Sequence, residues 1–120
     1  MAPNILVVED SELVTSAFRI LLEDAGYAVI DATTVGAAVS AARGKAIDVM
    51  LLDLTLPDGD GLSAMARMRD EGTLPKVVLA MTGDDEAETR RRCLEAGCSE
   101  VLIKPVSILV LRNMIARYLT

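Results

Sequence analysis

Short apolar runs alternate with longer amphipathic stretches from one end of this chain of 120 residues to the other, and no other feature of the sequence constrains the fold as strongly. The short runs are rich in Val, Ile and Leu, which is typical of strands buried on both faces of a sheet. They predict five strands, at residues 4–8, 28–30, 47–52, 77–81 and 101–103.

The longer stretches are expected to be helices. Between residues 11 and 24 the apolar side chains recur at intervals typical of one face of a helix. Glycine is a common helix stop signal, and Gly26, Gly44, Gly72 and Gly97 close four of the stretches. The predicted helices cover residues 11–24, 34–43, 60–71, 84–96 and 107–119.

Repeated alternation of strand and helix with short connections predicts a parallel sheet with right-handed crossovers and helices on both faces. The expected fold class is α/β, a doubly wound five-stranded parallel sheet of (βα)5 type. The chain has 120 residues, of which 52% are hydrophobic, so residues 1–120 are expected to form a single domain. Ligands of such folds bind at the carboxyl ends of the strands, which is where a functional site is expected.

Charge and composition exclude several kinds of function. The formal net charge is −6, which argues against a direct nucleic-acid partner and against binding to an anionic membrane. The sequence has no His, which excludes histidine-based acid–base catalysis, and no apolar run approaches the ~18 residues of a membrane span. Cys93 and Cys98 are expected to be buried or half-exposed thiols, and with no signal peptide ahead of them they predict a reduced, cytoplasmic protein.

Polar side chains follow the predicted strands. Glu9 and Asp10 follow the first, Asp53 the third, Thr82 the fourth and Lys104 the fifth. If the first and third strands are neighbours, the three carboxylates share one crevice, where they repel one another unless a cation compensates. Oxygen ligands of this kind favour Mg²⁺. A metal, an ammonium group and a hydroxyl together predict a cradle for a phosphoryl group.

In these features the sequence resembles the receiver domain of two-component response regulators, over essentially the whole chain. The matching pieces are Glu9 and Asp10 after ILVV, Asp53 in VMLLDLTLPDGDG with Pro57 and Gly61, Thr82 followed by Gly83, and Lys104 followed by Pro105. Each piece is weak alone, but their joint occurrence in order is specific. The resemblance implies a flavodoxin-like fold with strand order 2-1-3-4-5 and a cis Lys104–Pro105 bond.

The resemblance also implies the function, that of a phosphoacceptor signalling switch. Asp53 would accept a phosphoryl group from a histidine kinase or phosphotransfer protein, Lys104 would contact the phosphoryl oxygens, and Thr82 would bind them after transfer. The implied Mg²⁺ ligands are Glu9, Asp10, Asp53 and the backbone carbonyl of Thr55. Positioning and electrostatics carry most of phosphoryl-transfer catalysis, and these groups supply both.

The sequence departs from the family pattern at a residue that would help to transmit the signal to the surface. Many receivers carry Tyr or Phe three positions before the lysine of the last strand, where this chain has Val101. Without that ring, we expect the signal to pass through backbone displacement of residues 83–85 and the helix that follows. The expected output surface comprises the fourth helix, fifth strand and fifth helix, and a downstream output domain or protein would read it. The residues assigned to the switch and its output are Thr82, Gly83, Val101, Pro105, Arg90, Arg91 and Arg112.

Several local interpretations accompany these predictions. Asp58 and Asp60 are expected to be turn and N-cap residues of the helix at 60–71. Asp84 and Asp85 are expected to cap the helix at 84–96, with Glu88 completing a capping pair. The arginines at 90–92 are most simply a solvated face, and alternatively a partner surface.

Two other functions remain open. A Mg²⁺-dependent aspartyl-phosphate phosphohydrolase would need a second acid to protonate the leaving group, and Thr55 stands two residues beyond Asp53. An unphosphorylated receiver-like docking module would not need the complete set of acids, threonine and lysine. We therefore expect no enzyme activity beyond the chain's own phosphorylation and dephosphorylation, in a monomer or a phosphorylation-dependent dimer.

Overall fold

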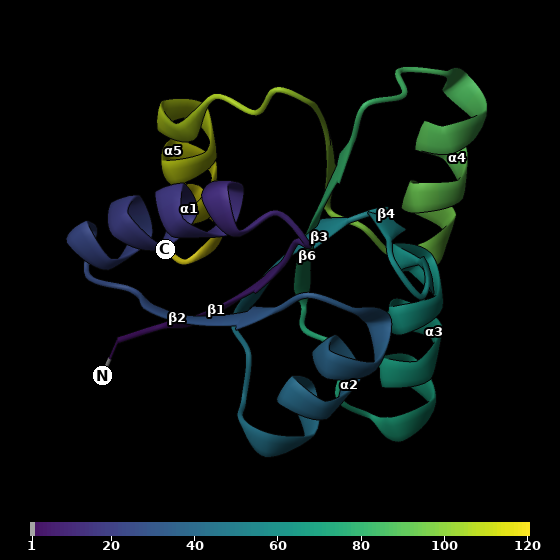
Figure 1. Cartoon of the computed structure of the whole chain (residues 1–120), viewed down its shortest axis with the longest axis horizontal. Coiled ribbons are helices and arrows are strands. Elements are labelled where there is room, and N and C mark those ends of the chain that lie inside the picture. The colour runs from purple at the N-terminus through teal and green to yellow at the C-terminus, as the bar shows by residue number, and fades with distance from the viewer. Residues whose placement is uncertain (1) are drawn as a thin grey trace.

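The computed structural model describes residues 2–120, and Figure 1 shows them as a sheet between two layers of helices. The elements follow the predicted alternation, with one small addition between the third strand and third helix. They are β1 (Asn4–Val8), α1 (Glu12–Asp24), β2 (Ala28–Ala32), α2 (Val35–Gly44), β3 (Val49–Asp53), β4 (Thr55–Leu56), β5 (Gly59–Asp60), α3 (Gly61–Glu71), β6 (Val77–Thr82), α4 (Ala87–Ala96), β7 (Glu100–Ile103) and α5 (Ile108–Tyr118).

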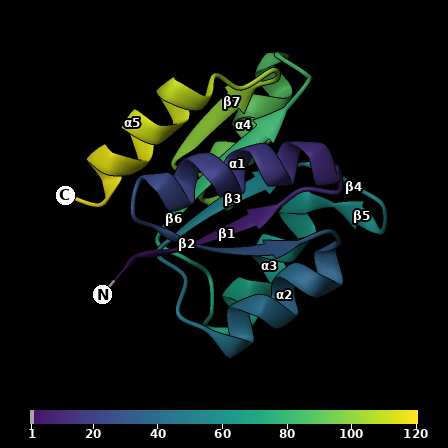
Figure 2. The same ribbon diagram turned by 60° about the vertical axis from the view of Figure 1, so that its left-hand side comes forward.

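The five main strands form one parallel sheet in the order β2-β1-β3-β6-β7 (Figure 2). Because β6 and β7 are the fourth and fifth predicted strands, the predicted order 2-1-3-4-5 and the doubly wound fold are confirmed. The register pairs Val8 with Leu52 and Asp53 with Met81. The carboxyl ends of the central strands β1, β3 and β6 therefore lie side by side.

Two apolar clusters fill the space between the sheet and its helices. Alternate residues of a strand point to opposite faces, so Ile5 and Val7 pack with α1 and α5, whereas Leu6 and Val8 pack with α2, α3 and α4. Figure 1 shows α1 and α5 together on one side of the sheet and the other three helices on the opposite side. A core on both faces fixes the strand ends from which the site is built.

The edge strands differ from the prediction that every strand is buried on both faces. All five residues of β3 are buried, whereas β2 has three half-buried residues and exposes Asp31, and β7 buries only Val101. β2 and β7 each have a neighbouring strand on one side alone, so solvent reaches residues that a central strand would bury. Length and apolar composition do not distinguish an edge strand from a central one.

Helix ends agree with their sequence signals in most places. The side chain of Ser11 accepts a hydrogen bond from the Val14 N–H at 3.3 Å, and Asp60 accepts one from the Leu62 N–H at 2.9 Å, as N-caps do. Gly72 and Gly97 adopt φ of 77° and 103° at the ends of α3 and α4, a conformation that favours glycine. These stop signals are confirmed.

Asp58 lies in a turn, as predicted, and its carboxylate also caps another helix, a role that the sequence analysis did not assign. It accepts hydrogen bonds from the N–H groups of Val35 at 2.7 Å and Gly36 at 3.2 Å, at the start of α2. Pro57 and Asp58 form the turn of an unpredicted antiparallel hairpin, β4 with β5. This turn carries Asp58 to a helix 23 residues earlier in the chain.

The start of α4 was also predicted wrongly. The helix begins at Ala87, and Glu86 occupies the N-cap position with no side-chain capping bond. Asp84 instead accepts hydrogen bonds from the Glu86 N–H at 2.8 Å and the Thr89 hydroxyl at 2.6 Å. The segment from 84 to 86 is therefore a loop stabilised by Asp84.

Two further features bear on the predictions. The Lys104–Pro105 peptide bond is cis, as the resemblance implied. Within residues 2–120, none of the helices combines the length and the apolar character needed to cross a bilayer.

Candidate functional site

Three carboxylates converge at the carboxyl ends of the central strands. Glu9 and Asp10 follow β1, Asp53 ends β3, and one carboxylate oxygen from each lies within 4.8 Å of the other two. Glu9 and Asp53 are 3% and 2% exposed, whereas Asp10 is exposed. The structure therefore brings together the three acids predicted from the sequence, with two of them inside the protein and the third at the opening.

Lys104 approaches this cluster from the loop after β7. Its Nζ lies 2.9 Å from Oδ2 of Asp53 and 3.8 Å from Oε2 of Glu9. The backbone N–H of Lys104 donates to the Thr82 carbonyl at 2.8 Å, which anchors the loop to the neighbouring strand. One ammonium group thus contacts two of the three carboxylates.

Burial and charge act on the pKa values of these groups. The pKa of Glu9 is raised, mainly by burial and also by the charge of Asp53, although the Ser11 N–H and Lys104 oppose the shift. Burial alone would lower the pKa of Lys104, but its hydrogen bond to Asp53 and the surrounding carboxylates raise it above its usual value. One ammonium group does not balance three carboxylates, so the cluster keeps a net negative charge unless a further cation binds.

The end of β3 is held by contacts that fix the Asp53 carboxylate. The Thr55 N–H donates to Asp53 Oδ1 at 3.0 Å, and the Leu54 N–H donates to the Met81 carbonyl at 3.1 Å. Gly61 packs so closely that a Cβ there would overlap the Asp53 backbone oxygen. The sequence analysis did not assign either role, although an acceptor side chain bonding the N–H two residues later is a common pattern for Asp.

Thr82 lies on the strand next to Asp53. It ends β6 one residue beyond Met81, the partner of Asp53 in the sheet, and is 7% exposed. Its Oγ1 accepts a hydrogen bond from the Asp84 N–H at 3.0 Å. The hydroxyl is therefore coupled to the loop that leads into α4, the segment expected to move.

The remaining predicted residues lie farther from the acids. Val101 is buried beneath α4, Arg90 and Arg91 are exposed on α4, and Arg112 on α5 lies 3.8 Å from Asp24 of α1. Arg112 thus faces α1, an arrangement that the sequence analysis did not foresee. The functional roles of these four residues, of Gly83 and Pro105, and of the Thr55 carbonyl stay predictions.

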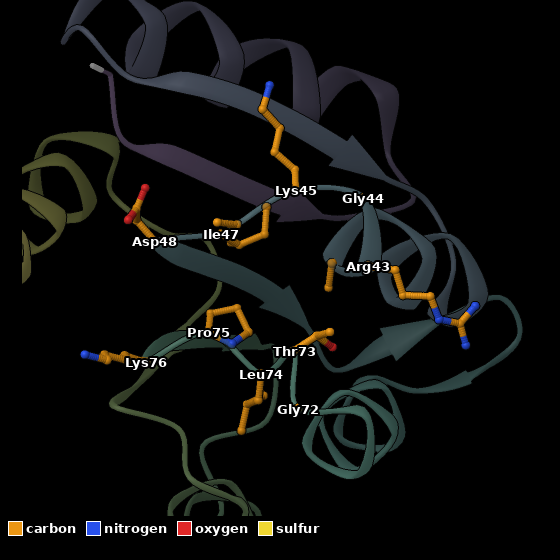
Figure 3. A pocket seen from close by; sticks show the side chains of 12 residues that line it. Arg43, Gly44, Lys45, Ile47, Asp48, Gly72, Thr73, Leu74, Pro75 and Lys76 are labelled. Carbon is orange, nitrogen blue, oxygen red and sulfur yellow. The ribbon is translucent and has the colours of Figure 1, made fainter.

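Two of the hollows in the described part of the chain adjoin the sheet, one at each end of its strands. One of about 620 Å³ opens beside Glu9 and Lys104 and is lined by apolar residues of α1 and by Pro105, Val106 and Ile108. The other, of about 560 Å³, lies at the amino ends of β3 and β6, where Lys45, Asp48 and Lys76 surround it (Figure 3). The acids lie beside the first hollow, so the chemistry belongs to the edge predicted for this fold class.

The donor set suits a hard divalent cation. Carboxylate oxygens from three residues converge, no His is present in the chain, and both cysteines are buried elsewhere. Oxygen ligands with room for water on the exposed side suit Mg²⁺ better than zinc or copper. An ammonium group 2.9 Å from Asp53 adds a donor for an anionic group. The site can hold a metal ion and a phosphoryl group together.

Comparison with known sequences agrees with this geometry. The family model described as response regulator receiver domain matches residues 5–116. The alginate biosynthesis transcriptional regulatory protein AlgB of Pseudomonas syringae pv. tomato is 33% identical over 116 residues, which are 97% of this chain and 26% of AlgB. The polar-differentiation response regulator DivK of Brucella ovis is 32% identical over 114 residues, which are 90% of this chain and 89% of DivK. The chain spans about a quarter of AlgB and most of DivK.

Solved structures show the same architecture. The receiver domain of the sensor histidine kinase PA1611 from Pseudomonas aeruginosa, which has a magnesium ion coordinated in its active site cleft, has a TM-score of 0.86 at 28% identity and covers 98% of both chains. A CheY-like receiver domain protein from Methanospirillum hungatei has a TM-score of 0.89 at 25% identity, over 99% of this chain and 94% of that one. The family match, the fold and the acidic cluster agree, and the chain belongs to the response regulator receiver domains of two-component signal transduction.

Proposed function

We propose that residues 1–120 form a single receiver domain in which Asp53 is the phosphoacceptor. The observation that carries the proposal is the surroundings of Asp53, a buried carboxylate with Lys104 Nζ at 2.9 Å and the acids Glu9 and Asp10 beside it. The phosphoryl group would come from a phosphohistidine of a histidine kinase or phosphotransfer protein. The nitrogen–phosphorus bond breaks and a bond from phosphorus to an Asp53 carboxylate oxygen forms, which gives an aspartyl phosphate.

Glu9, Asp10, Asp53 and the Thr55 carbonyl would hold Mg²⁺. When bound, the ion supplies the positive charge that the three carboxylates lack and offsets the charge of the phosphoryl oxygens. Membership of the family and the magnesium ion in the PA1611 receiver domain support this assignment. The exposed carboxylate of Asp10 leaves the ion open to water on one side.

Lys104 and Thr82 would act on the transferred group. Before transfer the Lys104 ammonium pairs with Asp53, and after transfer it can donate to a phosphoryl oxygen instead. Thr82 Oγ1 accepts from the Asp84 N–H, so a hydroxyl that turns toward the phosphoryl group gives up this bond. Residues 83–85 and the start of α4 would then shift, and phosphorylation would be reported through the backbone.

The partners follow from this role. We propose that a histidine kinase or phosphotransfer protein phosphorylates the chain in the cytoplasm, and that a downstream output domain or protein reads the surface of α4, β7 and α5. Arg90 and Arg91 of α4 are exposed, although Arg91 already pairs with Glu88 and Glu95 of the same helix. The chain would act as a signalling module, a monomer or a phosphorylation-dependent dimer, that catalyses only its own phosphorylation and dephosphorylation.

Intact mass spectrometry tests the proposal. After incubation with acetyl phosphate and Mg²⁺, the wild-type chain is expected to gain the mass of one phosphoryl group, and Asp53→Asn is expected to gain none. Asp70→Asn is the matched control, because Asp70 is exposed on α3, away from the acids. Phosphorylation of Asp53→Asn at the wild-type rate would overturn the assignment, as would equal losses in both variants.

A further inference from the structure

Cys93 and Cys98 occupy two linked positions at the end of α4. The Cys98 N–H donates to the Cys93 carbonyl at 3.0 Å, and the Gly97 N–H donates to the Leu94 carbonyl at 3.1 Å. With Gly97 left-handed at φ 103°, these two bonds define a Schellman motif. The motif brings the side chains of its first and last residues into contact, and here both are cysteines.

The backbone geometry permits a disulfide between them. A hydrogen bond of 3.0 Å from the Cys98 nitrogen to the Cys93 oxygen, with standard bond lengths, keeps the two Cα atoms within about 7 Å. Cα atoms farther apart than about 7 Å cannot be bridged without backbone movement. This limit is compatible with a bridge that forms by rotation of the two side chains.

Both thiols lie in the same buried cluster. Cys93 is 0% and Cys98 is 6% exposed, and the Cys98 Sγ lies 3.6 Å from the Met65 Sδ. Burial raises the pKa of both thiols, to about 12 for Cys98, whereas the Cys98 thiol and the Arg92 charge partly offset the shift at Cys93. In the closed structure the pair is therefore shielded from oxidants in solution.

The helix that carries Cys93 is loosely attached. Within α4, all of which the structure describes, Cys93 is the only buried residue. The half-buried Ala96 packs on the same apolar cluster, and two polar contacts add to it: Arg92 pairs with Asp60, just before α3, at 2.7 Å, and Arg69 of α3 donates to the Ala96 carbonyl. Elements with few buried apolar contacts open more readily than the core. We therefore expect α4 to open more readily than the core and to expose Cys93 when it does.

We propose that Cys93 and Cys98 form a reversible oxidation site, in which hydrogen peroxide converts the two thiols to an intrachain disulfide when α4 opens. The Cys93 thiolate attacks one peroxide oxygen, the O–O bond breaks, and a sulfenic acid and water form. The Cys98 thiol then attacks the Cys93 sulfur, an S–S bond forms and a second water leaves. Two thiols lose two electrons and two protons, and hydrogen peroxide is reduced to two waters.

The disulfide would tie the last turn of α4 to the start of β7. It would make the opening of this end of the helix harder, because a covalent link adds to the two hydrogen bonds of the turn. A dithiol reductant would reverse it. This proposal does not require phosphorylation, since neither cysteine lies at the acidic cluster.

Peptide mapping of the whole chain after treatment with hydrogen peroxide tests the product. Free thiols are blocked with N-ethylmaleimide, and a protease cleaves after Glu95, which lies between the cysteines. The expected result is two peptides joined by a disulfide, with both thiols lost together and both recovered with dithiothreitol. Overoxidised single cysteines, disulfide-linked dimers, or methionine oxidation with both thiols intact would overturn the proposal.

Two pairs of variants test the order of attack and the role of helix opening. Cys98→Ser is expected to trap a sulfenic acid at Cys93 that reacts with dimedone, and Cys93→Ser is expected to trap far less; the reverse would overturn the order. Arg69→Gln removes the hydrogen bond from α3 to the Ala96 carbonyl of α4 and should speed disulfide formation about two- to tenfold. Arg43→Gln removes an exposed ion pair with Glu71 away from α4 and should leave the rate unchanged. Equal rates in the two variants would overturn the requirement for opening, and the disulfide map of the wild type decides the product if a cysteine variant fails to fold.

Discussion

A single methyl group added at Gly61 tests how the site is built. A Cβ there would overlap the Asp53 backbone oxygen and would lie 3.1 Å from the Leu54 Cα. Both neighbours are backbone atoms, so neither can rotate away. The Gly61 N–H also donates to the Leu54 carbonyl at 2.8 Å, which holds α3 against the end of β3. Gly61→Ala is expected to push these two segments apart and to displace Asp53.

The magnitude follows from the nature of the clash. Inserting a methylene-sized group into a packed site costs about 1–3 kcal/mol, and rigid neighbours place Gly61→Ala in the upper half of that range. With a urea slope of about 1.5 kcal/mol per molar, the unfolding midpoint should fall by about 1–2 M. Phosphorylation should slow by about tenfold or more, because a catalytic group displaced by about 1 Å loses that much or more.

Gly44→Ala is the matched control. Gly44 is the last residue of α2, and a Cβ there would meet no atom within 4 Å. Alanine favours the helix over glycine, so this variant should gain up to about 1 kcal/mol. Urea unfolding followed by circular dichroism and the phosphorylation rate with acetyl phosphate measure both effects. Equal midpoints and equal rates for the two variants would refute the close packing of Gly61 on Asp53.

Three further predictions concern the metal, the hairpin and the output. Asp10→Asn should weaken Mg²⁺ binding by about tenfold or more, and unchanged affinity in titration calorimetry would contradict the proposed ligand set. Asp58→Ala should lower the urea midpoint at pH 7. Because the Val35 N–H bond holds the pKa of Asp58 below its usual 3.8, the difference from wild type should shrink as the pH falls below 3.8 and through the lowered pKa, and a difference that does not shrink would argue against the cap. Beryllofluoride, a phosphoryl mimic, should shift backbone amide resonances from residue 83 through 92 as well as those beside Asp53, and shifts confined to Asp53 and its neighbours would rule out this route.

Much of this fold follows from local patterns. Apolar runs place the strands, apolar spacing places α1, and glycines with positive φ end α3 and α4 where the sequence predicts. Three acids, a threonine and a lysine at strand ends predict one site because parallel strands bring their carboxyl ends to the same edge. The strand order required the family resemblance, since the alternation alone does not specify it.

The features that the sequence analysis missed have different causes. The predicted turn at Asp58 is present, but its bond to the start of α2 was missed, because nothing within a few residues of Asp58 signals a partner 23 positions away. Asp84 has the sequence signature of a cap but is engaged by Thr89 and the Glu86 N–H. The hairpin of β4 and β5 has two residues in each strand, too few for a periodic pattern.

Reductive trapping of the phosphorylated residue tests the central claim most directly. Borohydride reduces an aspartyl phosphate to homoserine, so peptide sequencing by mass spectrometry identifies the residue that carried the phosphoryl group. After incubation with acetyl phosphate and Mg²⁺, homoserine is expected at position 53 alone, and it should be absent when the metal is chelated. Homoserine at Asp10, at another aspartate, or at no position in a chain that has gained a phosphoryl group would contradict the assignment of Asp53.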